Sequence, residues 1–137
     1  MVKIDIVYEG DLHCRLTHGP SGDVIQTDAP VDNNGKGEAF SPTDLLAASL
    51  GSCMMTVMGI AAKRQGIELK GTTIHVEKEM ITAPVRRIGK ITVAFTMCKG
   101  IPFDKREILE RAAHACPVHK SLHPDVETPI TFNYSDE

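Results

Sequence analysis

The sequence has no excess of basic residues. Lysine and arginine together number 15 against 18 aspartates and glutamates, which gives a formal net charge of −3. No run of basic residues stands out in any part of the chain. A basic patch is what binding to nucleic acid or to an anionic membrane surface requires, so we expect neither kind of partner.

The sequence also lacks an apolar stretch at its beginning, and it lacks repeats, low-complexity tracts and linkers. Charged residues interrupt Val2–Tyr8 at Lys3 and Asp5, so this segment cannot serve as the apolar core of a secretory signal. We therefore expect a cytoplasmic protein. With 137 residues, 42% of them apolar and 24% charged, we expect one globular domain over residues 1–137.

Apolar and polar residues alternate in several short segments, which is typical of half-buried strands. The predicted strands cover residues 2–8, 12–17, 24–27, 72–81, 86–98 and 129–134. The fourth and fifth are separated by a short turn and predict a β-hairpin. Helices interrupt the series only twice, so the order predicts an α+β fold with a mostly antiparallel sheet and no repeated strand–helix–strand units.

The most distinct predicted element is a helix over residues 41–65. Ser41 as N-cap, Pro42 in the first helical position and Asp44 form a helix start, and Gly66 is a natural end. No charged residue occurs from Leu45 to Ala62. Such a stretch either spans a membrane or is buried on nearly all sides, and its small residues favour burial. A helix of roughly 24 residues is roughly 36 Å long and calls for neighbours on several sides, which the same chain or a second subunit would supply.

A second helix is predicted to open at Asp104 with a full capping box, and Pro117 ends or kinks it. A further helical turn is predicted over residues 118–123. The four cysteines of a chain in a reducing compartment point to redox or metal chemistry more than to structural disulfides.

Two of the cysteines have contrasting surroundings. Cys53 lies on an apolar face of the long helix, where it either packs as a small hydrophobe or needs a cation to become reactive, because burial raises the pKa of a thiol. Cys116 precedes Pro117, which predicts an N-cap position where the helix N-terminus favours the thiolate. A structural role in a helix kink is the alternative.

Histidines near Cys116 raise the question of a metal site. Cys116 and His119 have C-x-x-H spacing, His123 follows His119 by four residues, and His114 is close in sequence. With Cys53 these side chains would make a zinc site. A structural zinc site usually shows two close pairs of ligands, however, and the second pair is missing, so solvated surface histidines are the alternative.

Two stretches resemble the OsmC/Ohr family of hydroperoxide-reducing proteins. The first runs from Gly35-Lys36-Gly37 into Ser41-Pro42-Thr43-Asp44 and on to Cys53, and the second is Ala115-Cys116-Pro117-Val118 with the closing strand 130–134. The resemblance implies an OsmC-like fold, an intertwined α+β homodimer built on long central helices. It implies no metal and no flavin cofactor.

The resemblance also implies the chemistry. Cys53 would be the peroxidatic cysteine, whose thiolate takes an oxygen from an organic hydroperoxide and becomes a sulfenic acid. Cys116 would be the resolving cysteine, forming a Cys53–Cys116 disulfide that a dithiol, for example one of the lipoyl type, reduces again. The apolar surroundings of Cys53 suit a lipophilic hydroperoxide.

The chain departs from the family pattern where the attacking cysteine is activated. Active members pair that cysteine with an arginine, held by a glutamate in an Asn-Pro-Glu helix opening; the equivalent position here is Thr43. Glu38 is a candidate substitute, since Asp44 lies about 100° round the helix. Arg15 is the candidate arginine, with an exposed strand charge as the alternative.

Other imidazoles are further candidate activators, namely those of His18, His114 and His119. Cys14 and Cys98 are interpreted as packing residues. The missing glutamate leaves a second hypothesis open, an OsmC-like protein that binds a small apolar ligand and has little or no peroxidase activity.

Overall fold

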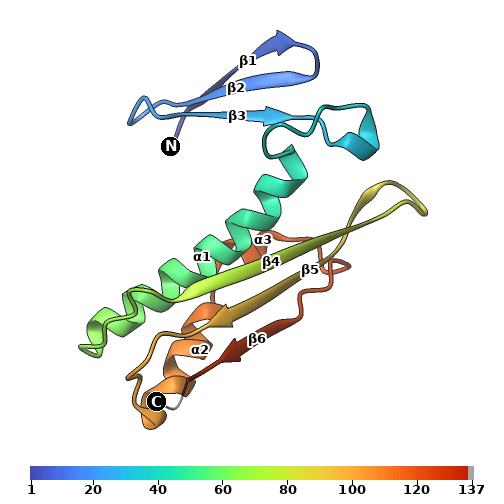
Figure 1. The fold of residues 1–137 in the computed structure, drawn as a ribbon. Coiled ribbons are helices and arrows are strands. Elements are labelled where there is room, and N and C mark those ends of the chain that lie inside the picture. Colours follow the sequence, from blue (N-terminus) through green and yellow to red (C-terminus); the bar gives the residue numbers. More distant parts are fainter. Residues whose placement is uncertain (136–137) are drawn as a thin grey trace. The chain divides into compact units, whose positions relative to one another are not determined.

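The structure is a computed structural model that describes residues 1–135. The chain divides into two compact units, Met1–Leu46 and Ala47–Glu137, and each is described by itself. The elements of both follow one another along the chain as labelled in Figure 1.

The first unit is a three-stranded antiparallel sheet of order β1-β2-β3. The strands are β1 (Ile4–Gly10), β2 (His13–His18) and β3 (Val24–Asp28), which confirms the three predicted strands within a residue or two at their ends. Neighbouring residues in register point to the same face. One face therefore carries Ile6, Leu16 and Ile25 side by side. Much of this apolar face is exposed in the chain, including Ile6 at 61%.

A loop containing the short 3₁₀ helix η1 (Val31–Asn33) leads into α1 (Pro42–Arg64). The predicted capping box is confirmed: the backbone N–H of Asp44 donates to the Ser41 hydroxyl at 3.0 Å, and the backbone N–H of Ser41 donates to the Asp44 carboxylate at 3.0 Å. At the other end Gly66 has a positive φ of 70°, and the Ile67 N–H reaches back to the Ala62 carbonyl at 2.9 Å. The helix thus starts and stops on the signals in the sequence.

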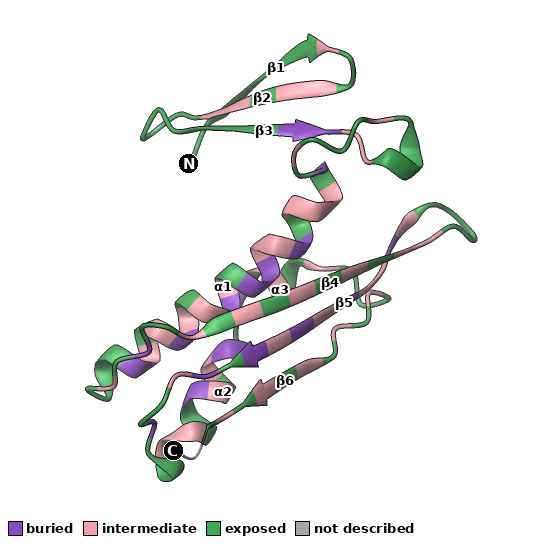
Figure 2. Cartoon of the chain, viewed as in Figure 1, coloured by how far each residue is buried: buried purple, intermediate pink, exposed green. Residues whose placement is uncertain are grey.

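Burial of α1 within the chain is confined to one face (Figure 2). The buried residues recur every three or four positions: Ala47, Leu50, Gly51, Met54, Met58 and Ala62. Ile60, on another side, is 51% exposed. The expected burial on nearly all sides is therefore not met by this one chain.

The length and composition of α1 would also allow it to cross a membrane. Its most apolar 18-residue window has a mean hydropathy of 1.8, and 33% of that window is buried. The core helix of a soluble protein passes the same test. Because one face of α1 packs into a core of buried side chains, we interpret it as a core helix.

The second unit contains a three-stranded sheet of order β4-β5-β6. The strands β4 (Thr73–Ile81) and β5 (Arg87–Thr96) form the predicted antiparallel hairpin. Strand β6 (Ile130–Asn133), in contrast, pairs with β5 in parallel. The predicted α+β fold with mostly antiparallel pairing is confirmed, but the strands form two separate sheets, and the β5–β6 pair is parallel. A parallel neighbour needs a long crossover, and residues 97–129 provide it.

The crossover contains two helices and a 3₁₀ turn. They are η2 (Phe103–Lys105), α2 (Arg106–His114) and α3 (Pro117–Ser121). The predicted capping box at Asp104 is wrong, because the 3₁₀ turn occupies these residues and α2 begins at Arg106 without a side-chain cap.

The helices α1 and α2 lie on the same side of the β4–β5–β6 sheet (Figure 1), and they share a core with it. Leu50 and Met54 of α1, Leu109 of α2 and Phe95 of β5 are fully buried. Close approach of helix and sheet depends on Gly51, since a Cβ built there would lie 2.9 Å from the Cγ2 of Val76. This core carries the two cysteines singled out by the sequence.

Candidate active site: a pair of cysteines

Cys53 lies near the middle of α1, within the second unit. It is partly buried and packs against the apolar core, next in the helix to the fully buried Met54. Its thiol is not in a disulfide. The helix thus places a free thiol at the border of the core, where it keeps some exposure to solvent.

Cys116 occupies the predicted N-cap position of α3, with Pro117 as the first helical residue. Its sulfur accepts a hydrogen bond from the backbone N–H of His119 at 3.5 Å. The residue is fully buried. Proline at the first helical position costs nothing, because the N–H it lacks would have no partner inside the helix.

The structure brings Cys53 and Cys116 together, although 62 residues separate them in the sequence. Burial raises the pKa of the Cys116 thiol, and a hydrogen bond with the Cys53 side chain raises this pKa further. The backbone N–H groups of His119 and Val118 act in the opposite direction. A raised pKa means that Cys116 holds its proton at neutral pH.

The expectation that the helix N-terminus makes Cys116 a thiolate is therefore wrong in direction. A short helix of five residues offers only a weak field, and loss of solvation disfavours the charged form of a fully buried sulfur. Of the two sulfurs, that of Cys116 is the more enclosed. Cys53 is the more accessible to a substrate.

His119 lies in the first turn of α3 and is the nearest imidazole to Cys116 along the chain on its C-terminal side. Its Nε2 lies 3.0 Å from the hydroxyl of Thr128. Its Nδ1 is buried, and no described residue forms a hydrogen bond with it. The ring thus forms a hydrogen bond through Nε2, and its Nδ1 forms none with a described residue.

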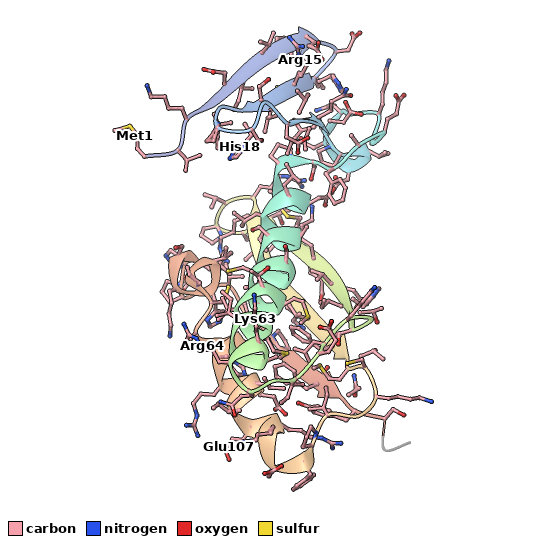
Figure 3. All side chains as sticks on the ribbon, turned by 90° about the vertical axis from the view of Figure 1, so that its left-hand side faces the viewer. Met1, Arg15, His18, Lys63, Arg64 and Glu107 are labelled. Atoms are coloured by element: carbon pink, nitrogen blue, oxygen red, sulfur yellow. The ribbon has the colours of Figure 1, made fainter. Side chains whose placement is uncertain are left out.

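The candidate activators Arg15 and Glu38 belong to the first unit. Arg15 stands on the sheet of that unit (Figure 3), where its Nε lies 3.8 Å from the Glu9 carboxylate. Its neighbours in register are Val7 and Gln26, so it points to the face opposite Ile6 and Leu16. The backbone N–H of Glu38 donates to the Asp28 carboxylate at 3.0 Å. The proposed action of Arg15 and Glu38 on Cys53 stays a prediction.

Thr43 and Asp44, at the positions around the family glutamate, are engaged in the start of α1. The hydroxyl of Thr43 lies 3.2 Å from that of Ser41, and the Asp44 carboxylate accepts the Ser41 N–H. These two side chains therefore serve the helix cap.

The histidines do not gather into a metal site. His123 lies beyond the end of α3 and contacts Asp125, whereas the ring of His119 contacts Thr128. The ring of His114 packs edge-on against Phe132, with centroids 5.9 Å apart. Among residues 1–135, no group of three or more histidine, cysteine, aspartate or glutamate side chains is arranged to hold a metal ion.

The remaining cysteines stand apart from the pair as strand or loop residues. Cys14 is in β2, in register with Tyr8 and Thr27. Cys98 follows β5, where its thiol lies 3.6 Å from the Glu68 carbonyl oxygen. Both are partly buried, in keeping with the packing roles expected for them.

Sequence reasoning missed one polar pair in the first unit. His13 Nδ1 lies 2.5 Å from the Asp28 carboxylate, and the two residues face each other across β2 and β3. The pair raises the pKa of His13 and lowers that of Asp28. A correct register for the predicted strands would have placed the two opposite each other. They line a hollow of about 220 Å³ together with Glu9, Lys36 and Glu38.

Comparison with known proteins gives one family. The sequence model of a family described as "OsmC-like protein" matches residues 35–131, which include both cysteines. No curated protein matches the chain.

Several solved structures resemble the chain along almost its whole length. A Psychrobacter arcticus protein, named for osmotic stress induction and a detoxification response, is 44% identical with a TM-score of 0.91, covering 97% of this chain and 96% of that one. An organic hydroperoxide resistance protein OsmC from Legionella pneumophila is 17% identical with a TM-score of 0.77, and the match covers 97% of this chain and 96% of that one. The organic hydroperoxide resistance protein OhrB of Bacillus subtilis is 20% identical with a TM-score of 0.67, and the match covers 97% of this chain and 98% of that one.

Proposed function

The chain belongs to the OsmC-like protein family, and from that premise we propose that it is a thiol-dependent peroxidase that reduces organic hydroperoxides. The observation that carries the proposal is the contact between the Cys53 and Cys116 thiols at the edge of the apolar core. Two relatives of the same fold are named for organic hydroperoxide resistance.

The proposed reaction uses the two sulfurs in order. The Cys53 thiolate attacks one oxygen of the hydroperoxide, the O–O bond breaks, an alcohol leaves, and Cys53 becomes a sulfenic acid. The Cys116 sulfur then attacks the Cys53 sulfur, which releases water and forms the disulfide. A dithiol, for instance of the lipoyl type, exchanges with the disulfide and restores both thiols.

The difference between the two thiols supports this order. Cys116 is fully buried and its pKa is raised, so it is the poorer nucleophile toward a substrate that arrives from solvent. Cys53 is less buried and contacts Cys116, so an oxidised Cys53 has its second thiol in place. The apolar core beside Cys53 favours the organic part of a lipophilic hydroperoxide.

A single-turnover experiment tests the proposal. Reduced protein is mixed with one equivalent of cumene hydroperoxide, and thiols and intact mass are followed in wild type, Cys53→Ser and Cys116→Ser, with Cys14→Ser and Cys98→Ser as matched controls. We expect two thiols lost in wild type and in both controls, none in Cys53→Ser, and a sulfenic or overoxidised Cys53 in Cys116→Ser. A wild type that keeps its thiols, or that reacts no faster than free cysteine, would show the proposal to be wrong.

A second candidate function is binding of a small apolar ligand with little or no turnover. It is favoured by Thr43, which stands where active members have a glutamate and whose hydroxyl contacts Ser41. Under this hypothesis the thiols survive the hydroperoxide, and native mass spectrometry of the protein as isolated shows a bound small molecule. Rapid loss of two thiols would contradict it.

We further propose that the protein is a homodimer. The apolar faces that one chain leaves open support this: Ile6 of β1 is 61% exposed and Ile60 of α1 is 51% exposed. A helix without charge from Leu45 to Ala62 and with one uncovered side gains free energy when a second chain covers that side. Sedimentation at micromolar concentration tests the state, with Ile60→Glu as the variant expected to dissociate it. A wild-type monomer would rule the dimer out.

A further inference from the structure

His119 carries a buried ring nitrogen, Nδ1, that the two-cysteine chemistry described above does not use. Its backbone N–H touches the Cys116 sulfur at 3.5 Å, and its Nε2 lies 3.0 Å from the Thr128 hydroxyl. Its Nδ1 is buried, and no described residue hydrogen bonds with it. Buried polar atoms nearly always have a partner, so an unused ring nitrogen on the residue whose backbone N–H contacts the Cys116 sulfur calls for an explanation.

The second step of the proposed reaction needs a proton acceptor. The Cys116 thiol is buried and stays protonated at neutral pH, yet it must attack as a thiolate. The N–H groups of His119 and Val118 stabilise negative charge on the sulfur, but N–H donors cannot accept its proton. An imidazole is the usual acceptor for such a transfer at neutral pH.

The tautomer in which Nε2–H donates to Thr128 would meet this need. A neutral imidazole has one N–H donor and one acceptor nitrogen. With Nε2–H donating to the Thr128 oxygen, Nδ1 is the acceptor. Nδ1 is also the ring nitrogen nearer to the main chain of His119, and that main chain contacts the Cys116 sulfur.

We propose that His119 Nδ1 accepts the proton of the Cys116 thiol when the Cys53–Cys116 disulfide forms. The inference rests on the proposed function and adds a residue to it. The Cys116 S–H bond breaks and its proton moves to Nδ1, while the sulfur's electron pair forms the S–S bond. The S–O bond of the Cys53 sulfenic acid breaks, and the departing hydroxide takes the proton from His119 and leaves as water.

A purely structural role for His119 is the competing explanation. The contact between His119 and Thr128 ties α3 to the segment before β6, and this tether alone would help to fix Cys116. Two variants separate the roles. His119→Gln keeps an amide near the Nε2 position for Thr128 and removes the base, whereas Thr128→Val removes the tether and keeps the base.

The experiment follows two rates in the reduced protein after one equivalent of cumene hydroperoxide, with dimedone trapping for the sulfenic acid and intact mass for the disulfide. We expect His119→Gln to form the sulfenic acid at the wild-type rate and the disulfide about 100-fold more slowly. Thr128→Val should change the disulfide step by less than about threefold, since the base remains. His119→Asn, which also lacks a base, should be as slow as His119→Gln if the defect is chemical.

The inference is overturned if His119→Gln forms the disulfide as fast as wild type, or if Thr128→Val is as slow as His119→Gln. Failure of the proposed function looks different, since no sulfenic acid then forms in wild type. In that case oxidation with diamide still requires Cys116 to lose its proton, and it tests His119 without a hydroperoxide. Equal diamide rates in wild type and His119→Gln would overturn the inference there too.

Discussion

The two glycines of α1 allow a direct test of how the helix packs. Gly51 and Gly59 lie in the same helix, but a Cβ at Gly51 would lie 2.9 Å from the Cγ2 of Val76 and 3.4 Å from that of Ile74. A Cβ at Gly59 meets nothing within 4 Å in the chain. The same substitution to alanine should therefore have opposite effects on stability at the two sites.

The size of each effect follows from two competing contributions. Alanine stabilises a helix interior over glycine by about 1 kcal/mol. At Gly51 the new methyl group also overpacks the core against Val76, which costs about 1–3 kcal/mol. We expect Gly51→Ala to lower the free energy of unfolding by about 1 kcal/mol and Gly59→Ala to raise it by about 0.5–1 kcal/mol.

Urea unfolding measures the difference between the two variants. A gap of about 2 kcal/mol corresponds to about 1 M urea between the midpoints, for a slope of about 2 kcal/mol/M. A Gly51→Ala variant as stable as Gly59→Ala would refute the close contact between α1 and β4. A Gly59→Ala variant that loses stability would mean that a second chain approaches the helix at this point.

Further predictions concern the first unit, the helix start and the core. Asp28→Asn should lower the pKa of His13 toward its ordinary 6.5, because the carboxylate that raises it is lost, and NMR titration of the His13 ring measures this; an unchanged pKa would contradict the ion pair. In wild type the pair stabilises the fold most at pH values between the lowered pKa of Asp28 and the raised pKa of His13. The urea midpoint should fall as the pH rises through the pKa of His13, and it should also fall as the pH drops through the pKa of Asp28. Ser41→Ala should cost about 1 kcal/mol in thermal unfolding, whereas Ser41→Asp should largely keep the cap. Leu109→Ala removes a fully buried side chain and should cost about 2–5 kcal/mol in the same assay, and a cost below about 1 kcal/mol would argue against its burial in the core.

Local patterns in the sequence accounted for most of the secondary structure. Alternating residues predicted the strands and the hairpin, because side chains of a strand point to opposite faces in turn. Ser41 and Asp44 marked the start of α1, because a capping box is a contact within four residues. The same kind of signal failed at Asp104, where a 3₁₀ turn occupies the predicted helix start.

Part of the site was also accessible from the sequence. Cys53 and Cys116 could be singled out by their motifs and by resemblance, and the N-cap position of Cys116 could be deduced from Pro117. Their interaction was implied by the resemblance but could not be deduced from local patterns. The two thiols are separated by 62 residues, and only the packing of α1 into the core brings them together. Nor did the spacing of the histidines indicate that His119 would contact Thr128.

Most elements of this protein, its pair of cysteines and its family could be derived from the amino-acid sequence, since these depend on neighbouring residues and on motifs. The parallel pairing of β6 and the raised pKa of Cys116, in contrast, depend on the packing of the whole fold. A helix N-terminus lowers a thiol pKa and burial raises it, and which effect prevails depends on how completely the rest of the fold excludes water from the sulfur. The direction of β6 depends on a crossover of more than thirty residues, and no local pattern encodes where such a crossover returns.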